Sequence, residues 1–208
     1  MRLGTTKLEC PICEETIVSS KMLSCTVMGL RTDLAMVGFC RSYPDIHICQ
    51  NCNYVYTDKT LKVDKTKIKK LLASPSYKEL FMKHSHRNEE YNPFKNIYKI
   101  YQYLEIDIYK QHHILLYSYY MDESLKNFKY FIDEIEKDLT LYKGKIIFRF
   151  PIDFYRGEYY RRIGEFNQAK EIFEKIIKEY KEEKFLKIAN FQLQLIAQKD
   201  RECRTIEK

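Results

Sequence analysis

The chain has 208 residues, of which 45% are hydrophobic and 31% charged, values that are ordinary for a soluble globular protein. No apolar run approaches the roughly 18 to 20 residues that a membrane span requires, and the residues after Met1 lack the apolar core of a secretion signal. We therefore expect a cytoplasmic protein that contacts no membrane. The net charge of +7 falls entirely after residue 60, because residues 1–60 contain six Lys or Arg and six Asp or Glu.

Two cysteine pairs share one internal spacing, Cys10-Pro11-Ile12-Cys13 and Cys49-Gln50-Asn51-Cys52. Thiolates at positions i and i+3 of a tight turn can both point at one ion, and two such turns complete a tetrahedron without leaving a position for water. This closure predicts a structural zinc ion bound by Cys10, Cys13, Cys49 and Cys52.

Other uses of these cysteines stay open, because the 35 residues between Cys13 and Cys49 exceed the usual ~15 to 20. Cys25, Cys40 or His47 could replace one ligand, or the cysteines could be ordinary reduced thiols. A redox dithiol at Cys10 and Cys13 is disfavoured, since no strand-then-helix unit surrounds the pair and a second matching pair fits shared ligation better. With four ligands assigned, Cys25, Cys40 and Cys203 are expected to be spare thiols in a reducing compartment.

Apolar residues come in short stretches from Leu8 to Tyr56, which predicts short strands or loops. Such a segment has too little apolar surface to offset its chain entropy. Structural zinc, which binds finger peptides with an apparent ~10 to 16 kcal/mol, supplies the difference. Near residue 60 the hydrophobic period changes from about 2 to about 3.6. We expect a zinc-ribbon-like module over residues 1–60 and a mainly α domain over 61–208.

The helical domain is expected to be an antiparallel array. Ser74-Pro75 and Asn92-Pro93 look like N-cap and first-turn pairs of two helices, and Lys143 with Gly144 are types that close a helix. Apolar residues also recur at intervals of three and four, which is typical of helices with one buried face. They are Ile68, Leu71 and Leu72; Phe94, Ile97, Tyr101, Leu104 and Ile108; Ile114, Tyr117 and Met121; and Leu125, Phe128, Ile132, Ile135 and Leu139.

The C-terminal third contains one pattern of small and aromatic residues that matches a tetratricopeptide helix-turn-helix, in which small residues let two helices approach. The pattern consists of Gly157, Tyr160, Gly164, Ala169 and Phe173. A capping helix with Ile188, Phe191, Leu195 and Ile196 is expected behind it. The usual Trp and Leu before the first Gly are absent, so an ordinary helical hairpin is the alternative.

Cys10-Pro11-Ile12-Cys13 and the segments 48–54 and 157–170 together resemble the bacterial domain-of-unknown-function family twenty-two twenty-five. The resemblance implies a four-cysteine zinc-ribbon-like N-terminus followed by tetratricopeptide-like helices, and no established activity. Glu14 and Asn53 stand where this family usually has Gly after each cysteine pair. Asn tolerates the left-handed conformation that such a turn needs, and Glu does so less well.

No nucleophile with a visible base, glycine-rich phosphate loop or His-Glu-x-x-His motif is present, so we expect no enzymatic activity. His84 and His86 are two residues apart and His112 and His113 are adjacent. Neither spacing places two rings on one helical face.

We therefore expect an adaptor or scaffold that binds an unidentified protein partner. Tyr159, Arg161 and Arg162 are residue types that anchor interfaces, and they are the expected contact residues. The alternative is a nucleic-acid-binding protein in which the zinc module and basic helices neutralise phosphates. The sequence leaves the oligomeric state open.

Overall fold

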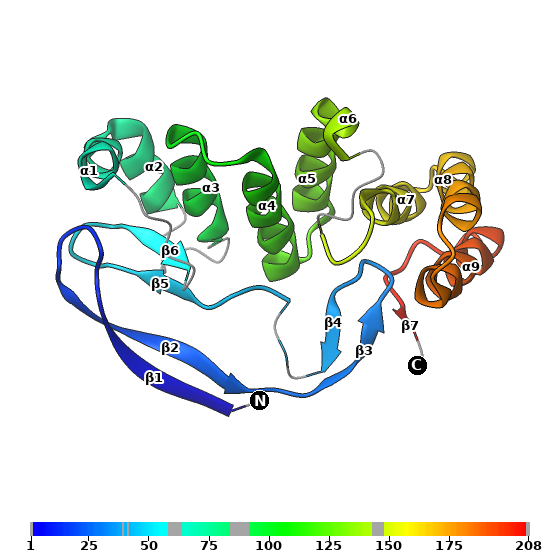
Figure 1. Ribbon diagram of the computed structural model, residues 1–208, viewed down its shortest axis with the longest axis horizontal. Helices are drawn as coiled ribbons and strands as arrows, with labels where there is room; N and C mark the ends of the chain where they lie inside the picture. Colours follow the sequence, from blue (N-terminus) through cyan, green and yellow to red (C-terminus); the bar gives the residue numbers. More distant parts are fainter. Residues whose placement is uncertain are drawn as a thin grey trace. The chain divides into compact units, whose positions relative to one another are not determined.

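The structure, a computed structural model, describes residues 2–38, 40, 42–57, 64–83, 92–142 and 148–206. Over these ranges the fold is mainly helical, with nine helices and seven short strands (Figure 1). The mainly α fold class is thus confirmed. Among the described helices none is long and apolar enough to cross a membrane.

The chain forms two compact units, and each combines strands with helices. One unit comprises Met1–Cys25 and Arg41–Glu123, and the other Thr26–Cys40 and Ser124–Lys208. This division differs from the expected boundary at residue 60. The physical reason is that buried contacts connect the two sides of that boundary: the hydroxyl of Tyr77, a fully buried side chain, donates to the carbonyl of Asn53 at 2.9 Å.

The first unit contains two antiparallel hairpins. Their strands are β1 (Arg2–Glu9) with β2 (Thr16–Ser24), and β5 (Ile46–Ile48) with β6 (Val55–Thr57). From Leu3 onward β1 pairs with β2 in regular register, ending with Glu9 opposite Thr16. The loop of each hairpin carries one cysteine pair. Short strands were expected here, but the extension of β1 to residue 2 was not.

Four helices complete this unit: α1 (Lys65–Ala73), α2 (Pro75–Lys83), α3 (Phe94–Tyr103) and α4 (Ile108–Asp122). The expected single stripe from Phe94 to Ile108 is divided between α3 and α4. Glu105 adopts a φ of 52°, and the carboxylate of Asp107 accepts the first amides of α4. A side-chain cap of this kind starts a new helix. The expected helix starts near Ser74 and Asn92 are confirmed to within one residue.

The second unit contains a sheet ordered β4-β3-β7 and five helices. The strands are β3 (Val27–Arg31), β4 (Met36–Gly38) and β7 (Thr205–Ile206), and the helices are α5 (Leu125–Lys137), α6 (Leu139–Tyr142), α7 (Ile152–Ile163), α8 (Phe166–Glu179) and α9 (Glu183–Ala197). Leu139 belongs to α6 rather than to α5. The expected helix end at Lys143 and Gly144 lies outside the described residues.

Helices α7 and α8 form a close helical hairpin. A Cβ atom at Gly157 would lie 2.7 Å from the ring of Phe173, so only Gly allows this approach. Gly164 ends α7 with a φ of 92°, the left-handed conformation that suits Gly at a helix C-terminus. Ala169 and Phe173 are fully buried between the helices.

Candidate metal centre

The sulfurs of Cys10, Cys13, Cys49 and Cys52 all lie within 4.8 Å of one another. The Cys10 and Cys52 sulfurs are 3.6 Å apart, and the Cys13 and Cys49 sulfurs 3.4 Å. Four thiolates around a tetrahedral zinc ion, at ~2.3 Å each, require sulfurs ~3.8 Å apart. The four predicted side chains are therefore close enough to hold one metal ion.

The two cysteine loops have the same backbone design. The amide of Cys10 donates to the carbonyl of Glu15, and the amide of Glu14 returns a bond to the Cys10 carbonyl, both at 2.9 Å. The second loop repeats this pair of hydrogen bonds. The amide of Cys49 donates to the carbonyl of Tyr54 at 2.9 Å, and the amide of Asn53 donates to the carbonyl of Cys49 at 2.8 Å.

Both loops also need one left-handed residue. Glu14 has a φ of 65° and Asn53 a φ of 62°, so the turn positions identified in the sequence adopt the conformation that usually favours Gly. Two sequence segments 35 residues apart thus form matching thiol-bearing turns.

The thiols share a site that cannot hold four negative charges without a cation. Burial raises the pKa of Cys49 and of Cys52, and at Cys52 the neighbouring thiols add to this effect. Burial by itself would raise the pKa of Cys13 as well. The amide of Glu15 and the polar groups of the second loop outweigh burial and lower the pKa of Cys13 to about 7. A divalent cation bound by thiolates removes this conflict.

The site is partly buried and is connected to the helices. Cys10 and Cys49 are fully buried, Cys13 and Cys52 are half-buried, and Ile12 between the first two cysteines is 2% exposed. Besides the Tyr77 bond, Lys65 of α1 forms an ion pair with Glu14 at 3.0 Å. Four thiols can fill the coordination sphere of one tetrahedral ion, which suits a structural ion, because a catalytic one keeps a position for water or substrate.

None of the alternative ligands joins the sulfur cluster. His47 is fully buried, and its Nδ1 lies 2.6 Å from the Ser19 hydroxyl. Cys25 and Cys40 are disulfide-bonded, which corrects their prediction as spare thiols. Cys203 is a free thiol, and it accepts from the Thr32 hydroxyl at 3.5 Å.

Two of the three expected partner-contact residues, Tyr159 and Arg161, are buried. The ring of Tyr159 packs edge-on against Phe128, with centroids 5.6 Å apart, and is 7% exposed. Arg161 is 0% exposed and pairs with Glu158 at 2.9 Å. Arg162 is half-buried, and its backbone carbonyl accepts from Arg201 at 3.0 Å. Tyr159 and Arg161 therefore stabilise the core and are not available to a partner.

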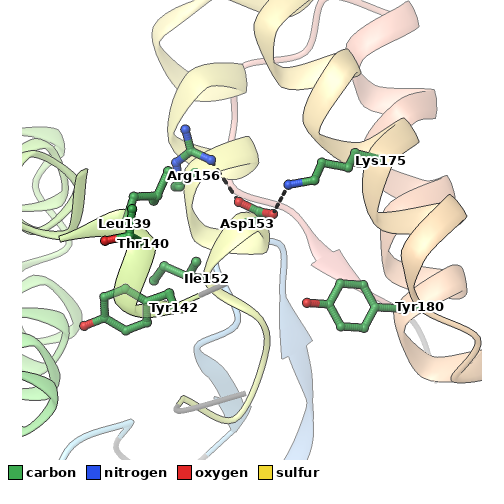
Figure 2. A pocket seen from close by; sticks show the side chains of 8 residues that line it. All are labelled: Leu139, Thr140, Tyr142, Ile152, Asp153, Arg156, Lys175 and Tyr180. Atoms are coloured by element: carbon green, nitrogen blue, oxygen red, sulfur yellow. Dashed lines mark hydrogen bonds and ion pairs between the residues drawn. The ribbon is translucent and has the colours of Figure 1, made fainter. Parts of the chain in front are cut away.

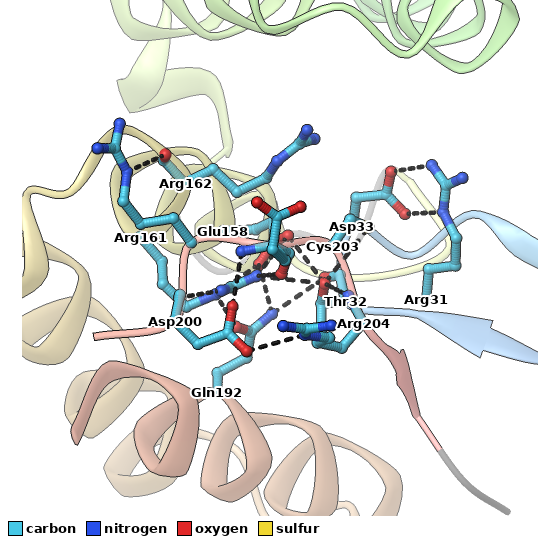
Figure 3. Close-up of polar contacts among 12 residues, drawn as sticks. Arg31, Thr32, Asp33, Glu158, Arg161, Arg162, Gln192, Asp200, Cys203 and Arg204 are labelled. Carbon is cyan, nitrogen blue, oxygen red and sulfur yellow. Dashed lines mark hydrogen bonds and ion pairs between the residues drawn. The ribbon is translucent and has the colours of Figure 1, made fainter. Parts of the chain in front are cut away.

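Arg161 belongs to a buried polar network of the second unit, drawn in Figure 3. Its guanidinium donates to the amide oxygen of Gln192 at 2.8 Å and to the carbonyls of Asp200 and Glu202. Burial raises the pKa of Glu158, while the positive charge of Arg161 acts in the opposite direction. The pair thus connects α7 and α9 to the C-terminal segment.

Within the described residues, no histidine belongs to a group of side chains close enough together to hold a metal ion. His112 is buried, and His113 donates from Nδ1 to the Tyr109 carbonyl at 2.9 Å. His84 and His86 lie outside the described ranges.

A pocket of about 220 Å³ opens between α6, α7 and α8 (Figure 2). Asp153 bridges Arg156 at 2.8 Å and Lys175 at 3.3 Å, and Arg156 also contacts Glu136 at 3.3 Å. Its charged side chains thus pair with one another. The described lining contains no Ser, Cys or His that could act as a nucleophile.

The apolar pattern of the sequence does not predict strand β1, because only Leu3 and Leu8 are apolar in it. The adjacent β-branched residues Thr5 and Thr6 were the available signal.

No family model, curated protein or solved structure matches the chain. The resemblance to family twenty-two twenty-five therefore stays a prediction.

Proposed function

We propose that this chain is a non-enzymatic adaptor or scaffold whose four-cysteine site holds a structural zinc ion. The observation that supports the zinc ion is the closed set of four sulfurs within 4.8 Å of one another. Zinc is the metal that such a tetrahedral thiolate set favours in proteins. The site would then anchor the loops of both hairpins, so that the metal builds a scaffold rather than a reaction centre.

The zinc assignment is tested by elemental analysis of the purified full chain. We expect one zinc ion per molecule, and its loss in a Cys49→Ser variant. Cys203→Ser is the matched control, because Cys203 is a free thiol outside the cluster. Less than one bound ion in the unaltered chain, or an equal metal content in both variants, would contradict the proposal.

The interaction role is supported by apolar side chains that the β1–β2 hairpin exposes to solvent. Leu3 is 48% exposed and Val18 68%, and both lie on the same face of the hairpin. Val18 lies opposite Lys7, four positions along β1 from Leu3, so the two side chains are spread along one face of the hairpin. A two-stranded hairpin by itself is marginally stable in water, and a partner that covers this face would stabilise it. We call the β1–β2 hairpin the arm, and we assign the partner contact to it in place of Tyr159 and Arg161.

A double variant, Leu3→Ser with Val18→Ser, tests this role in cells. Cross-linking to the principal partner protein should fall strongly, because the substitutions remove the apolar part of the contact. Met82→Ser is the control, since Met82 is 70% exposed on α2 and far from the arm in sequence. Equal cross-linking of both variants would count against the arm as the contact site.

The nucleic-acid alternative is supported by α1, which exposes Lys65, Lys67, Lys69 and Lys70. Phosphate contacts would make affinity fall steeply and linearly on a log-log plot against salt, whereas an apolar contact responds weakly. Nucleic acid that copurifies with the chain and is released by moderate salt would favour this alternative over the adaptor role.

The tetratricopeptide-like arrangement of α7, α8 and α9 is part of the same proposal. The close approach of Gly157 to Phe173 and the buried Ala169 support it, because they are the small and aromatic positions of that repeat. We also retain membership of family twenty-two twenty-five and a cytoplasmic location as proposals.

A further inference from the structure

The arm has one edge covered and one edge open. On the β2 side, the Met22 amide donates to the carboxylate of Asp45 at 3.1 Å, and the Ser19 hydroxyl donates to the Ile46 carbonyl at 3.4 Å. On the β1 side, no strand pairs with residues 2–9 within the described part of the chain. Alternate residues of an edge strand point their amides and carbonyls away from the sheet. β1 thus offers an unpaired edge eight residues long.

The two faces of the arm differ in exposure. One face packs toward the body at its base, where Ile17 is buried and Leu8 is half-buried. The opposite face is open along most of its length. We call it the open face, and it consists of Leu3, Thr5, Lys7, Glu9, Thr16, Val18, Ser20 and Met22. It carries one positive and one negative charge, so it has no excess charge that would attract phosphate.

The two charged side chains of the open face form no ion pair within the described part of the chain. Lys7 and Glu9 are exposed, and neither has an ion pair with a described side chain. On a strand they are two residues apart, and therefore on the same face. A neighbouring strand can pair with both.

We propose that the open edge of β1 accepts an extended segment of a partner protein as a third strand. An antiparallel segment would place a basic residue opposite Glu9, an acidic residue opposite Lys7, a β-branched residue opposite Thr5 and an apolar residue opposite Leu3. Backbone hydrogen bonds then supply affinity, and the alternate side chains supply specificity. This inference rests on the adaptor function and specifies the chemistry of its partner.

A second copy of this chain fits the edge poorly. When a two-fold axis perpendicular to the sheet relates two β1 strands, both open faces lie on the same side of the sheet. Residues directly opposite one another then belong to the same face, so the pair is centred on a residue and not between two residues. Centred on Thr5, the pair sets Leu3 opposite Lys7 of the other copy. Centred on Thr6, it sets Leu3 opposite Glu9. Either register places an apolar side chain against a charge, which the heterologous segment avoids.

Two synthetic peptides test the inference on the zinc-loaded full chain. The matched peptide reads Lys-Thr-Glu-Thr-Val-Thr-Leu, and the swapped peptide exchanges its Lys and Glu. We expect the matched peptide to bind about fivefold more tightly by fluorescence anisotropy, because two cross-strand ion pairs form in place of two like-charge pairs. Hydrogen exchange of the β1 amides should slow when it binds.

A charge-reversed protein provides the decisive comparison. Lys7→Glu with Glu9→Lys should reverse the preference between the two peptides. Lys21→Glu, on the opposite face of the arm, should leave it unchanged. Zinc content is measured for each variant to show that the hairpin loop is intact.

Equal binding of the two peptides, or binding without protection of β1, would overturn the inference. So would chain dimers whose formation protects the β1 amides. If these peptides fail while Leu3→Ser with Val18→Ser still abolishes the cellular contact, the adaptor function stands without strand addition. Failure of both experiments would remove the adaptor function as well.

Discussion

Arg161 illustrates, at the scale of single residues, how burial changes the role of a side chain. Its type suggested a partner contact, but its guanidinium is fully buried and pairs with Glu158. The amide of Gln192 accepts from it at 2.8 Å, although Gln192 lies 31 residues further along the chain. Sequence spacing does not reveal such a contact, because it arises only when α7 and α9 pack together.

Replacing Arg161 should therefore destabilise the second unit. Arg161→Ala leaves the Glu158 carboxylate buried without its partner charge, and removing one member of a buried pair costs about 3 to 5 kcal/mol. Urea unfolding measures this loss. Arg162→Ala is the control, because loss of the half-buried Arg162 side chain should lower the free energy of unfolding by about 1 kcal/mol or less. Equal losses in the two variants would mean that the buried network contributes little.

At the scale of elements, short polar residues and glycines decide where helices begin and how closely they pack. Asp107 accepts the amides of Tyr109 and Lys110 and so starts α4, which divides a stripe that looked continuous. Gly157 lets α7 approach the ring of Phe173. The periodicity predicted the helical segments, but it could not distinguish a cap from a polar residue on a helix surface.

Gly157→Ala should destabilise the α7–α8 hairpin by about 1 to 3 kcal/mol, because the new methyl group would lie 2.7 Å from the Phe173 ring. Thermal unfolding checks this value. Adding Phe173→Leu should recover part of the loss, since the smaller side chain makes room for the methyl group. A Gly157→Ala variant as stable as the unaltered chain would show that the two helices can separate without cost.

At the scale of the whole molecule, the metal site belongs to the unit that contains α1 to α4. Tyr77 and Lys65 connect the cysteine loops to α2 and α1. Loss of a structural ion that supplies folding energy should therefore affect these helices as well as the hairpins. From the sequence alone, we would expect chelation to unfold residues 8–56 and to leave the helical signal largely intact.

Hydrogen exchange with and without chelator distinguishes these expectations. We expect exchange to rise in residues 2–24, 46–57, 64–83 and 92–122, and to stay nearly unchanged in 125–142 and 152–197. The second unit is the internal control, because it has its own core. A rise confined to residues 8–56 would show that the boundary near residue 60 separates independent folding units after all.

The sequence by itself determined the four cysteines of the candidate metal site, the mainly helical body and the helix starts near Ser74 and Asn92. These features follow from local spacing, capping and periodicity. Only the tertiary structure decided that Tyr159 and Arg161 are buried, that the first hairpin extends to residue 2 with an open edge, and that the first four helices share a unit with the cysteine loops. Each of these depends on contacts between segments distant in sequence, which local patterns do not encode.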